Sequence, residues 1–364
     1  MSPSYARTSI AAVVAALALA GCSLSSSGDG GSTPGATGSG SGSSTVKNTT
    51  VTLVTHDSWV ADKALLAKFT AQTGYTVKVI ANGDAGQLAN KLVLTKGNPT
   101  GDVTFGVDNT FATRVVDSGA IQAYSAKNLP ASAQRFALTG DGGKDLTPID
   151  FGDVCVNVDD AWFTKKGQTP PANFADLVKP EYKNQFVTPA ASSSSPGMAF
   201  LLATIAKYGT DGWQNYWKQL MANGTKLTSG WSDAWSVDYT AGGGNGSRPI
   251  VLSYNTSPAD TIKDGKATTS ALLDTCFQSV EYAGVLAGAK NPDGAKAFID
   301  FMLGEDFQKA LPEAMYVFPV DTSIPLPAAW QQAAKVPATP LNVDPGEITK
   351  NRDTWLREWQ DVTS

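Results

Sequence analysis

The sequence predicts an α/β protein of two lobes, in which each lobe is a mainly parallel sheet flanked by helices and two hinge strands join the lobes. Two successive series of alternating strand and helix patterns predict one sheet for each lobe. Residues 51–364 are also numerous enough to bury a large core in two parts. Two extended segments lie where the chain would leave the first lobe and later return to it.

The first series begins at residue 51. Its strand segments are rich in β-branched residues, and its helix segments repeat apolar residues at helical spacing. Strands are expected at residues 51–55, 75–81 and 103–107, and helices at residues 61–72 and 87–94. This order of strand, helix and strand predicts parallel neighbours in one sheet.

A second series follows Pro148 and predicts the other lobe. Strands are expected at residues 154–158, 186–188, 226–227, 250–254 and 277–285, and helices at residues 173–178, 198–208, 213–222, 292–303 and 307–310. The hinge strands are expected within residues 149–157 and 275–285. We therefore assign residues 51–149 and 281–320 to lobe 1, residues 150–280 to lobe 2, and residues 321–364 to a C-terminal helical tail that packs on the lobes.

The first 22 residues predict export and a lipid anchor. Arg7 precedes an apolar run over residues 10–20 that is too short to span a membrane, and Leu-Ala-Gly-Cys at residues 19–22 is typical of a site where Cys22 is acylated. The alternative is an ordinary secretory peptide with an incidental cysteine. Residues 23–50 are rich in Ser and Gly and predict a flexible tether. We expect a protein anchored to the outer face of the bacterial cytoplasmic membrane.

Cysteine content and charge narrow the class of protein further. Cys155 and Cys276 remain after Cys22 is set aside, and in an oxidising compartment we expect them to form a disulfide. Two buried free thiols are the alternative. The formal net charge of −5, with Lys and Arg spread thinly, argues against nucleic-acid binding.

Polar residues follow several predicted strands, at the edge where open α/β sheets bind ligands. The serine run at residues 192–195 precedes Pro196, so free backbone N–H groups there could bind an anion. Simple capping of the helix that follows is the alternative. The residues at these junctions are Asp57, Ser58, Asp84, Ala85, Gly86, Asp108, Asn109, Ser194 and Ser195.

Aromatic residues and hydroxyls gather in two turn-rich stretches of the second series. Trp231, Trp235 and Tyr254 offer faces that hold flat or cationic ligands, and Ser253 and Thr256 lie beside them. Each aromatic taken singly could instead be a core residue.

The sequence carries no catalytic motif that we recognise. His56 is the only histidine, and no nucleophile elbow, HExxH motif or P-loop is present. Clusters of His and Cys that would hold a metal are also missing from the sequence. We therefore expect neither an enzyme, nor a metal site, nor a cofactor.

Several segments carry a family resemblance, and two of them are the most specific. Residues 230–235 (Gly-Trp-Ser-Asp-Ala-Trp) and 252–259 (Leu-Ser-Tyr-Asn-Thr-Ser-Pro-Ala) are the most specific parts of a chain that, from residue 51 onward, resembles the thiamine-binding proteins of ABC importers. The resemblance implies the type II periplasmic-binding-protein fold. It also implies a monomer that closes its lobes on thiamine or a thiamine phosphate and delivers it to an ABC permease driven by its ATPase.

The resemblance also implies roles for particular residues. Ser194 and the backbone near Ala85 would face the hydroxyethyl or phosphate end of the ligand, and Trp231, Tyr254 and Tyr316 would line it or lie near it. Asp57 and Asp108 would be polar partners or helix caps. The chain departs from the family at His56 and Asp260, each of which replaces a tyrosine, and Asp260 could instead be the counter-ion of a thiazolium. The expected ligand-binding residues are His56, Asp57, Ser58, Asp84, Ala85, Gly86, Asp108, Asn109, Ser194, Ser195, Trp231, Trp235, Ser253, Tyr254, Thr256, Asp260 and Tyr316.

Other functions remain open at this point. A carrier of ferric iron or of a polyamine with the same fold is the nearest alternative. Iron carriers of this fold commonly use paired tyrosines, and no Tyr-Tyr pair occurs here. An extracellular hydrolase is the alternative from another class of protein.

Overall fold

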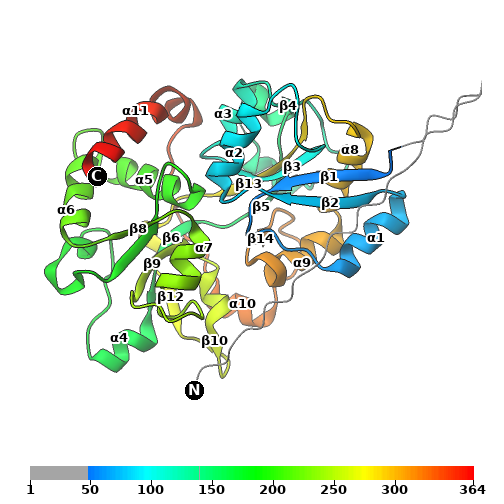
Figure 1. Ribbon diagram of the computed structural model, residues 1–364. Helices are drawn as coiled ribbons and strands as arrows, with labels where there is room; N and C mark the ends of the chain where they lie inside the picture. The colour runs from blue at the N-terminus through cyan, green and yellow to red at the C-terminus, as the bar shows by residue number, and fades with distance from the viewer. Residues whose placement is uncertain (1–47, 139) are drawn as a thin grey trace, which may run out of the picture. The chain divides into compact units, whose positions relative to one another are not determined.

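The computed structural model describes residues 48–138 and 140–364 (Figure 1). The expected export signal, the acylated Cys22 and the tether up to residue 47 lie outside these residues. None of the helices in the described part of the chain is long and apolar enough to cross a membrane.

A seven-stranded sheet forms lobe 1. Its strands lie in the order β14, β5, β13, β3, β1, β2, and β4 pairs with β13. The strands are β1 (Thr50–Thr55), β2 (Thr76–Ala81), β3 (Val103–Asp108), β4 (Ile121–Gln122), β5 (Thr147–Phe151), β13 (Val280–Leu286) and β14 (Phe318–Pro319), and the helices of this lobe are α1 (Lys63–Thr73), α2 (Ala85–Leu94), α3 (Ala112–Asp117), α8 (Pro292–Met302) and α9 (Glu305–Met315). Two 3₁₀ helices, η1 (Ala131–Phe136) and η2 (Gly140–Lys144), lie between β4 and β5.

A five-stranded sheet forms lobe 2, in the order β12, β6, β9, β7, β8. The strands are β6 (Val154–Asp159), β7 (Phe186–Pro189), β8 (Lys226–Thr228), β9 (Ile250–Tyr254) and β12 (Thr269–Ala271), and the α-helices are α4 (Asp160–Lys166), α5 (Ser195–Tyr208), α6 (Trp213–Ala222) and α7 (Trp231–Asp233). Shorter elements are the 3₁₀ helices η3 (Asp176–Val178), η4 (Pro180–Tyr182), η6 (Ser257–Thr261) and η7 (Leu273–Thr275), the π-helix η5 (Ala234–Asp238) and the hairpin of β10 (Ile262–Lys263) and β11 (Lys266–Ala267).

The two-lobed α/β fold is confirmed, but the sheets are mixed rather than mainly parallel. Parallel pairs occur only where helices connect the strands, in β2–β1–β3 and in β8–β7–β9. The chain passes from one lobe to the other at two crossings, residues 152–153 and 276–279. The strands that follow these crossings are antiparallel to their neighbours: β13 to β3 and β5, and β6 to β9 and β12. The strands β4 and β14 are also antiparallel to their partners β13 and β5, so antiparallel pairs are the majority in the larger sheet and half of the pairs in the smaller one.

Local sequence explains where several elements start and stop. The Asp62 side chain accepts a hydrogen bond from the Ala64 N–H at the start of α1, and Gly74 ends that helix with φ of 75°, a conformation that favours glycine. Pro312 lies inside α9, which continues to Met315 although the expected helix ended at residue 310.

Three expected elements differ from the structure. The segment 149–157 is interrupted at Gly152 and Asp153, where the chain passes from β5 to β6. The segment 275–285 becomes a strand only at Val280, because residues before it turn through η7 and Phe277 forms an isolated bridge to Val154. The helix expected at 173–178 is reduced to the 3₁₀ turn η3.

The C-terminal helices complete the fold. They are α10 (Ala328–Ala333) and α11 (Pro345–Thr363), and Asp344 caps α11 by accepting hydrogen bonds from two backbone N–H groups. Trp359 packs edge-on against Trp217 of α6, with ring centroids 5.5 Å apart. The Arg352 guanidinium lies 4.0 Å from the ring centroid of Phe111, just before α3. The helix α11 therefore contacts both lobes.

A disulfide joins the two crossings between the lobes. It links Cys155 at the start of β6 to Cys276, which directly follows η7, across a separation of 121 residues. Both side chains are buried.

Replacing both cysteines by alanine should lower the free energy of unfolding by about 2–5 kcal/mol, because the unfolded chain loses a long cross-linked loop. Urea unfolding followed by tryptophan fluorescence measures this loss. The matched control is the unmodified protein unfolded with dithiothreitol, which should shift by a similar amount. Equal stability of the oxidised protein and the double variant would contradict the expectation.

Candidate ligand-binding site

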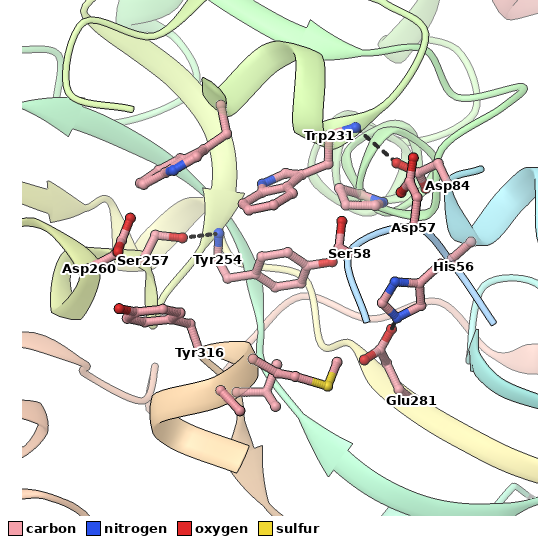
Figure 2. A pocket seen from close by; sticks show the side chains of 16 residues that line it. His56, Asp57, Ser58, Asp84, Trp231, Tyr254, Ser257, Asp260, Glu281 and Tyr316 are labelled. Atoms are coloured by element: carbon pink, nitrogen blue, oxygen red, sulfur yellow. Dashed lines mark hydrogen bonds and ion pairs between the residues drawn. The ribbon is translucent and has the colours of Figure 1, made fainter. Parts of the chain in front are cut away.

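A cavity lies between the lobes, with side chains of 16 residues around it (Figure 2). Its empty volume is about 810 Å³, part of which opens to solvent, and this size suits a small organic molecule. Lobe 1 contributes His56, Asp57, Ser58, Asp84, Ala85, Glu281, Ala314, Met315, Tyr316 and Val317, and lobe 2 contributes Pro196, Trp231, Trp235, Tyr254, Ser257 and Asp260.

Aromatic rings form the lobe 2 wall of the cavity. Trp231 and Trp235 stack at 5.8 Å between centroids with 16° between their planes, and Tyr254 meets Trp231 at 63°. The Trp231 Nε1–H donates a 2.9 Å hydrogen bond to Ser253 Oγ, which also pairs with Ser257 Oγ at 2.7 Å. These hydroxyls hold the indole in one orientation, so its face is ready for a planar ligand.

Tyr316 faces this wall from lobe 1 (Figure 2). It ends α9 with φ of 55° and ψ of 44°, a left-handed conformation that is uncommon for a residue other than glycine. Its ring stacks on Trp330 at 6.0 Å, and the Asp260 carboxylate of lobe 2 lies close enough to accept a hydrogen bond from its hydroxyl. The unusual backbone turns the side chain toward the cavity.

Asp84 connects the lobes on the other side of the cavity. It precedes α2, yet its side chain does not cap that helix. Instead, its two oxygens accept hydrogen bonds from lobe 2, one from the Ser195 N–H at 3.1 Å and one from the Trp231 N–H at 2.8 Å. Ser58 and Ser232 add a 3.2 Å contact between hydroxyls of the two lobes. The structure is therefore a closed form.

Acidic side chains outnumber basic ones around the cavity. Four carboxyl groups line it, those of Asp57, Asp84, Asp260 and Glu281, and none of the described residues that line it is Lys or Arg. A cation would therefore be attracted into the cavity, whereas an anion would meet like charge.

Burial and like charge shift the pKa values of the acids in and below the cavity. Burial raises the pKa of Asp84, although the N–H groups of Trp231 and Ser195 oppose the shift. Burial also raises the pKa of Asp108 to about 6, against opposing hydrogen bonds from Ser195 and Thr110. Acidification through this range therefore removes negative charge from beside the cavity.

His56 lies at the floor of the cavity, where its Nε2 is 3.2 Å from Glu281 Oε1 (Figure 2). Burial alone lowers the pKa of this imidazole. The carboxylates of Glu281, Asp84 and Asp57, with Glu281 contributing most, together outweigh that effect, and the pKa is raised overall. A protonated His56 thus neutralises part of the charge of Glu281.

Ten of the seventeen expected ligand-binding residues line the cavity. They are His56, Asp57, Ser58, Asp84, Ala85, Trp231, Trp235, Tyr254, Asp260 and Tyr316. His56 and Asp260, the two positions at which the sequence was expected to depart from the proteins it resembles, are among them.

The other seven residues do not line the cavity and serve the structure around it. Ser194 caps α5 through a 3.5 Å contact with the Gly197 N–H, so the helix itself uses this serine. Ser195 Oγ donates to the buried Asp108 carboxylate at 2.6 Å, which joins the lobes. Asn109 bonds to Gln278 O and Val280 N beside β13.

The remaining three residues lie beneath the lining. A side chain at Gly86 would meet the backbone of Ser193 at 2.7 Å, so glycine allows the lobes to approach closely there. Ser253 orients Trp231, and Thr256 is fully buried. These three residues support the residues that line the cavity.

Six lining residues were not expected: Pro196, Ser257, Glu281, Ala314, Met315 and Val317. Glu281 could have been found, because it is the charged residue in the apolar strand Val280–Leu286. Ser257 belongs to the turn-rich stretch at 252–259. Ala314 and Met315 gave no signal in the sequence.

Replacing Asp84 by asparagine should favour an open form. An amide presents N–H groups to one of the two backbone donors, so one hydrogen bond is lost and the closed form loses about 1–3 kcal/mol. Small-angle X-ray scattering should then show a larger radius of gyration. The control is Asp57→Asn, which removes a carboxylate of the same cavity without touching the two N–H groups. An unchanged radius for Asp84→Asn, or an equal increase for both variants, would refute this role of Asp84.

Comparison with known proteins gives a consistent picture. Residues 98–340 match the family described as bacterial extracellular solute-binding proteins. The thiamine-binding periplasmic protein of Escherichia coli (strain K12) is 29% identical over 321 residues, covering 86% of this chain and 93% of that protein. That of Brucella suis biovar 1 is 31% identical over 330 residues, with coverage of 86% and 92%. A solved periplasmic thiamin binding protein superposes with a TM-score of 0.75 at 27% identity, over 86% of this chain and 96% of that one.

Proposed function

Because the chain belongs to the bacterial extracellular solute-binding proteins, we propose that it captures thiamine or a thiamine phosphate and delivers it to an ABC permease and its ATPase. One observation carries the proposal beyond the family. The cavity between the lobes combines a stacked aromatic wall with four carboxyl groups, and no Lys or Arg lies among its described lining residues.

Thiamine has the chemistry that this cavity complements. It joins two flat rings, an aminopyrimidine and a thiazolium with a permanent positive charge. The faces of Trp231 and Tyr254 suit the flat rings and attract a cation by about 0.5–2 kcal/mol each. The carboxylates of Asp260 and Glu281 supply opposite charge at either end of the cavity (Figure 2).

The cavity is less suited to a ligand that carries a phosphate. Among the expected anion-binding groups, the Ser195 N–H at the start of α5 already bonds to Asp84. Phosphate carries about −1.5 to −2 charge at neutral pH and would meet the carboxylates of the lining. We therefore expect thiamine to bind at least as tightly as its monophosphate and diphosphate.

Closure of the lobes is the proposed capture step. Ligand between Trp231 and Tyr316 would be held by groups from both lobes, and the contacts of Asp84 with lobe 2 would seal it in. The permease would then recognise the closed form. Opening requires rotation at the crossings near Gly152 and Cys276, where the backbone is not in a strand.

The cellular setting forms part of the proposal. Membership of an extracellular family supports export. We propose in addition that acylated Cys22 anchors the protein to the outer face of the membrane, that residues 23–50 act as a tether, and that the protein acts as a monomer without catalysis.

Alternative ligands remain testable against the same cavity. A polyamine would also be drawn to the carboxylates, although it has no flat ring for Trp231 and Trp235. For ferric iron, the described residues contain no group of three or more His, Cys, Asp or Glu side chains placed to hold a metal ion. These observations favour thiamine.

Calorimetric titration of purified protein with thiamine, its monophosphate and its diphosphate tests the proposal, with spermidine and ferric citrate as competing candidates. We expect one-to-one binding, with thiamine at least as tight as its phosphates. Tighter binding of spermidine or iron than of every thiamine compound would overturn the proposal. Steady turnover of generic ester or phosphate substrates would contradict a pure binding role.

Trp231→Ala should weaken thiamine binding at least about tenfold, since it removes the central ring of the aromatic wall. Trp162→Ala is the matched control, because Trp162 lies in α4 and does not line the cavity. Titration of both variants checks the expectation. Unchanged affinity of Trp231→Ala would remove this residue from the site.

A further inference from the structure

Asp150 is a buried acid that the proposed binding site does not use directly. It lies on β5, its side chain is fully buried, and it is not part of the cavity lining. In the described part of the chain neither of its carboxyl oxygens meets an N–H or O–H donor. The group that faces it is the carboxyl of Glu281, near enough for a hydrogen bond.

Strand register places Asp150 in a row of three acids. Glu281 of β13 is opposite Asp150 of β5 on one side and opposite Asp108 of β3 on the other. Directly opposed residues of antiparallel strands point to the same face of the sheet, and like charges in such positions repel. Three ionised carboxylates in this row would therefore be costly.

A proton between Asp150 and Glu281 removes that cost. Two carboxylates cannot form a hydrogen bond with each other unless one of them carries a proton. Burial first, and then Glu281, raise the pKa of Asp150 well above its ordinary range. One proton shared by the two groups would therefore account for their close approach.

Other ionisable groups surround the pair and define its environment. His56, after β1, contacts Glu281 from the cavity side, and Asp108 completes the row. Asp84 and Tyr254 lie near enough to interact electrostatically with the same cluster. Glu281 is the member that lines the cavity, so a bound cation reaches the pair through it.

We propose that Asp150 is a positioning residue that shares a proton with Glu281, and that a cationic ligand drives this proton out to the solvent when it binds. A cation beside Glu281 stabilises the ionised form of the pair, so the proton leaves to the buffer and both carboxyl groups of the pair become ionised. Without ligand, the shared proton keeps the buried acids from repelling one another. The ligand-driven step rests on the proposed function, whereas the shared proton does not.

Calorimetric titration with thiamine at pH 7 in phosphate and in Tris measures the released protons, because the two buffers differ in ionisation enthalpy. The unmodified protein should release at least about 0.3 proton per ligand, and its affinity should fall about tenfold between pH 7.5 and pH 5.5. Asp150→Asn is nearly isosteric and can donate an N–H to Glu281. It should release less than half as many protons and lose less than about threefold in affinity over the same range.

Asp153→Asn is the matched control. Asp153 is also a buried acid near the crossing, and burial raises its pKa to about 7, yet it neither lines the cavity nor pairs in the acid row. This variant should keep the proton release of the unmodified protein. Equal binding enthalpy in both buffers, or the same proton release from Asp150→Asn as from the unmodified protein, would overturn the inference while leaving thiamine binding intact.

Unfolding curves test the shared proton without any ligand. Because the pKa of Asp150 is raised in the folded protein, its contribution to stability is present at low pH and is lost as the pH rises through the folded value. The thermal midpoint should therefore fall more steeply from pH 4.5 to pH 7.5 in the unmodified protein than in Asp150→Asn. Parallel curves would refute the shared proton, and absence of thiamine binding at every pH would instead refute the proposed function.

Discussion

The arrangement of the cavity depends on one carboxylate, that of Asp84, which accepts backbone hydrogen bonds from the lobe opposite its own. Through Ser195 and Trp231 it connects the start of α2 to the start of α5 and to the aromatic wall. Hydrogen bonds to a charged acceptor are among the strongest that a protein forms. This contact holds the Trp231 backbone against lobe 1, while the hydrogen bond from the indole to Ser253 orients the ring.

Burying so many acids around one cavity is unfavourable for the isolated protein. Asp84, Asp108, Asp150 and Glu281 are buried or half-buried, and a protein whose purpose was stability would carry apolar residues at such positions. The cost is consistent with the proposed binding of a cation. A cationic ligand would supply the positive charge that the lining lacks, and relief of repulsion already present in the protein would then contribute to the free energy of binding.

Local signals predicted much of the fold and ten of the sixteen residues that line the cavity. Turn residues after strands located Asp57 and Asp84, and the clustered aromatics located Trp231 and Tyr254, because these patterns are read over a few neighbouring residues. The antiparallel course of β13 was not predicted, since its partners are far away in the sequence. The use of the Ser195 N–H by Asp84 was missed for the same reason. The sequence around a helix N-terminus does not show whether its backbone N–H groups are free or already donate hydrogen bonds to a distant side chain of the same chain.

The disulfide between Cys155 and Cys276 makes the hinge depend on the redox state of the compartment that holds the protein. Its sulfurs lie at the two places where the chain passes between lobes, and such bonds persist in oxidising compartments but not in the cytosol. A molecule kept on the reducing side of the membrane would have two unlinked crossings and a looser hinge. Under the proposed function, full binding competence would then be acquired only after translocation.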